Sequence, residues 1–477
     1  MKKLSLTPAK LLTLVSAVLF VLIWSVWFFG YRHFLIWLEG YSFFSTLPDF
    51  ASQYFSIKEG LPGYIGAFLH QFYAMPVLGA AIQSVLFIWP MLCLGVIILR
   101  LFKNPANLLW IAFIPLPFLA KEQIWDLHLY YTMIVFMVST AVMLLILILT
   151  CFWKPEWKLP DFIANKYLNA GLMIVSAAVS VYMLTFESSR AIVHEDYAKL
   201  EYLGENHRWE DILREVSPSD ARTDDLKRAY ALLALSESGL LADYAFRYGL
   251  DGQDNFVFSD KIDPLYLNYN ALFYQCQDMH NAVIHQTYQQ GVQSVTGVSF
   301  STMRRLADTY IELKDYGLAK KYVDILSHTT CHKSWVKERL PKLEAIRNAT
   351  PAYEYDEYKA TISNFTHTIS SMVDRNRNNR KYADLLLCSL LAEEEGDQFK
   401  NIFRYIAEIQ YPSGTRIPRL YEEALVLISM VDPSVLEGYA ISEDTRKRFA
   451  DYVDMMNAGR GNQAMRKHAD TYWVYSY

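Results

Sequence analysis

Apolar residues are gathered into long uncharged stretches in the first 186 residues, a pattern that predicts helices crossing a membrane. A spanning helix needs about 20 apolar residues. Four stretches approach or exceed this length, and a fifth, shorter stretch contains Pro115 and Pro117. We therefore expect about five spans, near residues 11–29, 77–99, 104–120, 127–153 and 167–186.

From residue 187 onward the apolar residues recur three and four positions apart, as they do on one face of a helix. Trp209, Ile212 and Val216 are an example of this spacing. The predicted fold class is all-α. We expect a transmembrane domain over residues 1–186 and an extramembrane helical domain over residues 187–477.

One segment of the second half, Leu306–Leu326, resembles a tetratricopeptide unit, in which two helices pack as a hairpin. Small Ala307 is followed by aromatic Tyr310 and then by small Ala319, and small residues let the two helices approach. The same offsets fit three other windows less well, near residues 229–248, 270–289 and 389–408. We expect a helical-repeat solenoid, whose curved face typically binds protein or peptide; an irregular helical bundle is the alternative.

Composition supports this division of the chain. The sequence is 52% apolar and 15% aromatic, more apolar than soluble proteins usually are. Residues 1–186 carry 11 Lys and Arg against 7 Asp and Glu, and the remaining residues carry 34 against 43. We expect the first part to contact membrane lipid, and the acidic second part argues against a nucleic-acid partner.

The distribution of Lys and Arg predicts the orientation, since basic residues accumulate on the cytoplasmic side. If all five stretches cross, eight basic residues lie inside and three outside; if residues 104–120 do not cross, the ratio is 6 to 5. We therefore expect five crossings in the inner membrane of a bacterium, with the carboxy-terminal domain in the periplasm. Whether residues 104–120 cross the membrane therefore decides on which side the carboxy-terminal domain lies.

Catalytic signatures are missing from the sequence. It contains no GxGxxG, GxxxxGK[ST], HExxH or GxSxG motif, and its five cysteines form no CxxC pair. We predict no metal and no cofactor. Cys276, Cys331 and Cys388 are expected to be buried thiols, although one disulfide among them is an alternative.

Ionisable residues at the outer ends of the expected spans are the remaining candidates for chemistry. Asp49, Asp126 and His128 belong to a group that also includes Glu39, Lys58, Glu59, Lys121 and Glu122. Such residues at the ends of spans are usually interfacial. In the alternative interpretation they are catalytic, because glycosyltransferases that use lipid-linked sugars place an acidic residue in the first outer loop, where Asp49 lies.

Several pieces of the chain resemble a family of uncharacterised bacterial multi-pass membrane proteins, a domain of unknown function. They are Phe68–Ala80, Ala191–Asp196, Arg208–Ile212 and the aromatic tail Asp470–Tyr475. The resemblance covers nearly the whole chain and implies a membrane module followed by a helical-repeat region. It implies no activity and no site residues.

The expected function is therefore that of a membrane-anchored scaffold, not an enzyme, whose helical repeats bind a protein or peptide at the outer face of the inner membrane. The alternative is a glycosyltransferase-like enzyme that acts on a lipid-linked sugar through Asp49, Asp126 and His128.

Overall fold

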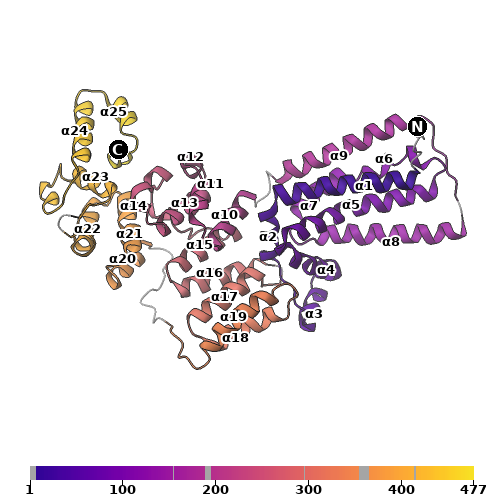
Figure 1. The fold of residues 1–477 in the computed structure, drawn as a ribbon, viewed down its shortest axis with the longest axis horizontal. Coiled ribbons are helices and arrows are strands. Elements are labelled where there is room, and N and C mark those ends of the chain that lie inside the picture. Colours follow the sequence, from indigo (N-terminus) through magenta and orange to yellow (C-terminus); the bar gives the residue numbers. More distant parts are fainter. Residues whose placement is uncertain are drawn as a thin grey trace, which may run out of the picture. The chain divides into compact units, whose positions relative to one another are not determined.

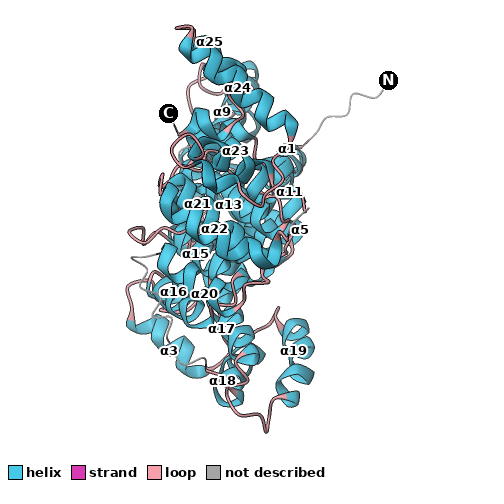
Figure 2. Ribbon diagram, turned by 90° about the vertical axis from the view of Figure 1, so that its left-hand side faces the viewer, coloured by secondary structure: helices cyan, strands magenta, loops and turns pink. Residues whose placement is uncertain are grey.

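The computed structural model is helical throughout the residues that it describes, which are 7–153, 155–188, 195–294, 296–353, 365–412 and 415–476. Coloured by secondary structure, these residues appear as helices joined by loops (Figure 2). An isolated bridge between Phe102 and Trp157 is the single extended pairing among them. The all-α prediction is confirmed.

The chain divides into two compact units, each made of two separate stretches. Unit 1 comprises Met1–Tyr202 and Gly291–Ala352, and unit 2 comprises Leu203–Gln290 and Tyr353–Tyr477. This division differs from the expected boundary at residue 187, because residues 291–352 pack with the first part of the chain.

The first stretch of unit 1 contains the long apolar helices and the short helices that join them. Their bounds are α1 Pro8–Ser25, η1 Val26–Gly30, α2 Arg32–Tyr41, α3 Pro48–Ser56, α4 Gly60–His70, η2 Gln71–Ala74, α5 Pro76–Leu101, η3 Pro105–Asn107, α6 Trp110–Phe113, α7 Leu116–Trp125, α8 Tyr130–Phe152, α9 Lys166–Ser188 and α10 Glu195–Glu205, whose last residues belong to unit 2.

Four helices of unit 1 are long and apolar enough to cross a membrane: Pro8–Gly30, Pro76–Leu101, Tyr130–Phe152 and Lys166–Phe186. They agree closely with four of the five expected spans. Helix α5 packs against both α1 and α8 in the interior of this bundle (Figure 1). Helix α8 exposes apolar side chains along its length, and Phe152, its last residue, is 89% exposed. Such exposure suits contact with lipid.

The fifth expected span, residues 104–120, is not a continuous helix. Pro115 and Pro117 fall where α6 ends and α7 begins, since proline lacks the N–H that a helix interior needs. Side chains of α9 bond the interrupted backbone: Asn169 Oδ1 accepts from Trp110 N–H at 2.9 Å, and Ser176 Oγ donates to Phe113 O at 2.6 Å. Among the described residues, four continuous helices are therefore long and apolar enough to cross a membrane, and the fifth expected span is not one of them.

The second stretch of unit 1, which we call the docked segment (residues 291–352), contains the hairpin that resembles a tetratricopeptide unit. Ala307, Tyr310 and Ala319 are all buried in it, as their spacing predicts. Its helices are α17 Phe300–Glu312, α18 Tyr316–Ser327 and α19 Lys333–Ala345. The helical hairpin is thus present, but the small and aromatic residues of its pattern are buried within the protein itself.

Backbone hydrogen bonds join the docked segment to the loop after α2. Phe300 N–H donates to Ser42 O at 2.8 Å, and Thr46 N–H donates to His328 O at 2.8 Å. A buried carboxylate adds to these bonds: Glu39 Oε2 accepts from Arg304 Nη2 at 3.4 Å, and Glu39 Oε1 lies 2.7 Å from His332 Nε2. The docked segment is therefore part of the same packed body as α2.

Unit 2 is built of short helices around three buried ones, α13 Asp225–Glu237, α21 Arg380–Ala392 and α23 Arg419–Ile428. The contacts of α14 with both α21 and α23 join these helices into one array. Its other helices are α11 Trp209–Glu215, α12 Pro218–Thr223, α14 Leu241–Tyr244, η4 Phe246–Tyr248, η5 Gln253–Asn255, α15 Pro264–Cys276, α16 His280–Val292, α20 Phe365–Arg375, α22 Gly396–Gln410, η6 Pro433–Leu436, α24 Glu443–Asn457, α25 Gly461–Lys467 and α26 Tyr472–Tyr475.

Candidate functional site

Asp126 and His128, two of the three predicted site residues, lie in the turn between α7 and α8, where they meet residues from the segment between α1 and α5. The acid–histidine cluster, as we call it, consists of Glu59, His70, Asp126 and His128. Glu59 lies in the turn before α4 and His70 is the last residue of α4. Asp126 lies close enough to Glu59 to raise its pKa, and His128 lies close enough to His70 to lower its pKa.

Backbone packing brings the two loops together. A Cβ atom at Gly66 of α4 would lie 2.6 Å from His128 O, so the absence of a side chain there permits close approach. Leu129, at the start of α8, adopts a left-handed conformation with φ 56°, which reverses the chain sharply. Asp126 Oδ2 accepts a hydrogen bond from Thr132 N–H at 2.7 Å and so caps the first turn of α8.

Burial disfavours charge on all four side chains of the cluster. Burial raises the pKa of Asp126, although hydrogen bonds from backbone N–H groups lower it. Burial also raises the pKa of Glu59, and the charge of Asp126 raises it further. Burial lowers the pKa of His128, and burial together with His128 lowers the pKa of His70 to about 3. Both histidines are therefore neutral at physiological pH.

Three buried polar atoms around the cluster make no hydrogen bond to a described residue: Glu59 Oε2, His70 Nε2 and Tyr73 Oη. Burial, followed by the charge of Asp126, raises the pKa of Tyr73 well above its ordinary value, so its hydroxyl keeps its proton. A cavity of about 10 Å³ lies beside His70 and His128. That volume suits about one water molecule, which could bridge such atoms.

Asp49, the third predicted site residue, does not join the cluster. It lies in the first turn of α3 with its side chain exposed to solvent. Lys58, Lys121 and Glu122 are also exposed. The structure therefore brings together Asp126 and His128 but separates Asp49 from them.

Glu39 is buried elsewhere in unit 1, between α2 and the docked segment. Its carboxylate is 1% exposed and faces His332 Nε2 at 2.7 Å and Arg304 Nη2 at 3.4 Å. Burial alone raises the pKa of Glu39, but Arg304 and His332 outweigh burial and bring it below its ordinary value. The sequence places the two partners far from Glu39, so local patterns could not identify this ion pair.

Metal-binding geometry is not found in the part of the chain that the structure describes, where no three His, Cys, Asp or Glu side chains are arranged to hold an ion. All five cysteines lie within the described residues and are free thiols.

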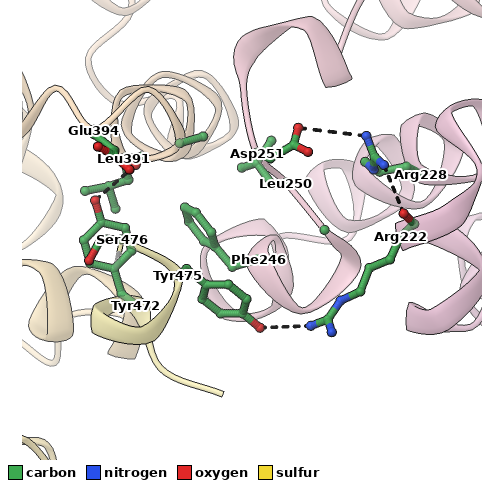
Figure 3. A pocket seen from close by; sticks show the side chains of 12 residues that line it. Arg222, Arg228, Phe246, Leu250, Asp251, Leu391, Glu394, Tyr472, Tyr475 and Ser476 are labelled. Carbon is green, nitrogen blue, oxygen red and sulfur yellow. Dashed lines mark hydrogen bonds and ion pairs between the residues drawn. The ribbon is translucent and has the colours of Figure 1, made fainter. Parts of the chain in front are cut away.

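A larger, open pocket lies within unit 2, with a volume of about 330 Å³. Figure 3 shows Phe246 and Tyr475 in its middle, with Arg222 on one side and Glu394 on the other. Part of its wall is the carboxy-terminal aromatic tail. Sequence reasoning did not predict this pocket, because its residues come from segments more than 200 positions apart.

A model of a family of unknown function, DUF6057, matches residues 7–191 and 125–477. No curated protein and no solved structure matches the chain.

Proposed function

Starting from the fact that the chain belongs to DUF6057, a family of unknown function, we propose that it is a membrane-anchored scaffold whose extramembrane helices bind a protein or peptide partner. The observation that carries the proposal is the difference in volume between the two candidate sites. The cavity that His70 and His128 help to line has a volume of about 10 Å³, whereas the helical array of unit 2 holds an open pocket of about 330 Å³. Pockets that bind small molecules typically have volumes of about 300–1,000 Å³, and a single side chain of a peptide needs less.

In this proposal the partner binds at the outer face of a bacterial inner membrane. This location of unit 2 requires the chain to cross the membrane five times. Helices α5 and α8 run in the same direction, since Trp89 Nε1 donates to Thr140 Oγ1 at 2.7 Å in mid-helix and Lys103 N–H donates to Trp157 O beyond their ends. The chain between them, residues 102–129, therefore returns along the bundle as the broken segment α6–α7. Protein-covered breaks of this kind are tolerated in membranes because neighbouring helices bond the backbone.

Basic residues support the same orientation. With five crossings, the ratio of Lys and Arg is 8 inside to 3 outside. We expect a reporter that works only outside the cytoplasm to be active when fused after Tyr477 and inactive when fused at Asn104. Activity in the opposite sense would place unit 2 in the cytoplasm and overturn the proposed location.

Crosslinking of the intact protein in native membranes, followed by affinity capture, tests partner binding. We expect a discrete partner that is captured by the full chain and competed by isolated, soluble partner. A capture pattern identical to that of an unrelated membrane protein would contradict the scaffold role.

A second candidate function is favoured by the convergence of Asp126 and His128 with Glu59 and His70. An enzyme that transfers a lipid-linked sugar would use such an acid as its catalytic base. The separation of Asp49 and the small cavity argue against it. Transfer from a polyprenyl-phosphate sugar by purified protein, abolished in Asp126→Asn and retained in Asp49→Asn, would support the enzyme; no transfer by the wild-type protein would remove it.

A further inference from the structure

The pocket of unit 2 has a different chemical character at each end. Arg222 and Arg228 lie at one end, where Asp251 is 3.9 Å from Arg228 Nη1 and partly offsets its charge; Glu394 lies at the other end, and Phe246, Tyr472 and Tyr475 form aromatic walls (Figure 3). We propose that this pocket binds a peptide segment in which a carboxylate stands next to an aromatic or aliphatic group. This inference rests on the proposed function and names the chemistry of the partner.

At the basic end, the guanidinium of Arg228 is held by hydrogen bonds within the protein, and that of Arg222 has donors left for a ligand. Arg228 is 9% exposed, and its Nε and Nη2 donate to Ala221 O at 3.0 Å and Arg222 O at 3.3 Å. Asp225 lies 3.4 Å from its Nη1. Arg228 therefore holds the turn that carries Arg222.

Arg222 is exposed, and its Nη2 donates to Tyr475 Oη at 3.2 Å. A guanidinium carries five N–H donors in a planar fork, so donors remain for both oxygens of a carboxylate. Gly249 makes room for this side chain: it has φ 83°, and a Cβ atom there would lie 2.9 Å from Arg222 Cγ. The basic end is thus built for an anion with bidentate geometry.

The aromatic middle is held rigidly. The Phe246 ring lies 5.4 Å from the ring of Tyr472, edge to face, and 5.4 Å from the ring of Tyr475. Tyr472 N–H donates to Glu423 Oε2 at 2.8 Å, and its hydroxyl donates to Leu391 O at 3.0 Å. A preformed aromatic wall costs little entropy on binding and favours a flat or branched apolar group.

The tail that forms this wall is anchored on both sides of Tyr472. Asp470 pairs with Arg419 at 3.0 Å and with Arg448 at 2.6 Å. Trp473 is 1% exposed and packs in a core with Tyr452. The pocket therefore does not depend on a loose chain end.

The acidic end favours an N–H donor over a second anion. Glu394 is exposed and has a left-handed backbone with φ 58°. Burial, followed by the charge of Glu394, raises the pKa of Tyr472 to about 12, so the tyrosine stays neutral. A peptide offers backbone N–H groups on the side of its apolar residue away from the carboxylate, which matches this polarity.

Calorimetric titration of the full chain in nanodiscs tests the assignment with two matched probes, N-acetyl-phenylalanine and its amide. They differ in the carboxylate alone. We expect the acid to bind at least about tenfold more tightly than the amide, a difference of about 1.4 kcal/mol. Arg222→Gln should abolish this difference, and Arg247→Gln, which removes a nearby charge outside the pocket lining, should retain it.

A third probe, N-acetyl-aspartyl-phenylalanine amide, tells a side-chain carboxylate from a terminal one, and the tighter of the two acids identifies the source. Equal binding of acid and amide, no binding of any probe, or an unchanged preference in Arg222→Gln would overturn the assignment. Capture of the same partner by wild-type protein and Arg222→Gln would also overturn it, while leaving the scaffold role intact.

Discussion

Glu39 is the buried acid that faces the docked segment, residues 291–352, and Glu39→Gln should loosen this segment. The substitution keeps the side-chain volume but removes the charge that faces Arg304 and His332. Removal of one partner of a buried ion pair typically costs about 3–5 kcal/mol, because the other charge stays buried without compensation.

The expected cost lies near the lower end of that range. Arg304 is 29% exposed and can regain water once the carboxylate charge is removed. We therefore expect about 3 kcal/mol for local opening of the docked segment. At about 1.4 kcal/mol per factor of ten, this corresponds to amide exchange about a hundredfold faster.

Hydrogen exchange with mass spectrometry in detergent measures this opening. The reporting amides are those that join the docked segment to the rest of unit 1: Thr46 and Phe300, which bond backbone carbonyls, and Thr330, which donates to Gln71 Oε1 at 2.9 Å. Peptides of unit 2 should be unchanged. Glu338→Gln, which removes a 68% exposed carboxylate of α19, is the matched control and should have no effect.

Unchanged exchange at these amides in Glu39→Gln would refute the reasoning, since the docked segment would then be held without the ion pair. Equal acceleration in both units would refute it as well, because the effect would then be global.

Three other predictions follow from the packing and the buried acids. Glu59→Gln should raise the thermal midpoint above that of wild type at pH 8 but not at pH 4, because an acid whose pKa is raised by folding lowers the stability of the folded state as the pH rises above its ordinary pKa. Glu122→Gln, at an exposed site, is the control, and a change in midpoint that is independent of pH would contradict this prediction. Gly66→Ala should destabilise by about 1–3 kcal/mol through the clash with His128 O, whereas Gly171→Ala, where a Cβ atom meets no neighbour within 4 Å, should be neutral or stabilising; equal midpoints would contradict the close approach. Burial raises the pKa of Asp384 to about 6 and that of Glu423 to about 7, so the free energy of unfolding of unit 2, measured by exchange, should fall from pH 5 to pH 8, and a rise would contradict their burial.

Four apolar helices could be predicted from the sequence because their signal is local. A long uncharged stretch has few alternatives, so the expected ranges agree with α1, α5, α8 and α9 to within a few residues. The broken segment at residues 104–120 could not be predicted in detail. Its two prolines indicate a break, but the bonds from Asn169 and Ser176 that support it come from α9, far along the sequence.

The docked segment shows the same limit. The spacing of Ala307, Tyr310 and Ala319 predicted a helical hairpin, and these residues are buried as expected. What the hairpin packs against depends on Arg304 and His332 meeting Glu39, a pairing with no local signature.

The acid–histidine cluster was predictable in part. Asp126 and His128 are neighbours in sequence at the end of a span and were identified together. Their convergence with His70 depends on the close approach at Gly66, which is a property of the packed backbone. Asp49 and Glu59 both lie in the loop expected between the first two spans, so the sequence could not tell the exposed acid from the buried one.

Site-specific photo-crosslinking in intact cells tests the central claim, that unit 2 binds a partner. A photoreactive residue at Phe246, in the pocket wall, is compared with one at Tyr288, an exposed position of α16 outside the pocket lining. The account predicts one discrete adduct to a second protein or peptide from position 246, absent from position 288 and weakened by Arg222→Gln. Identical adducts from both positions, or none from position 246, would contradict it.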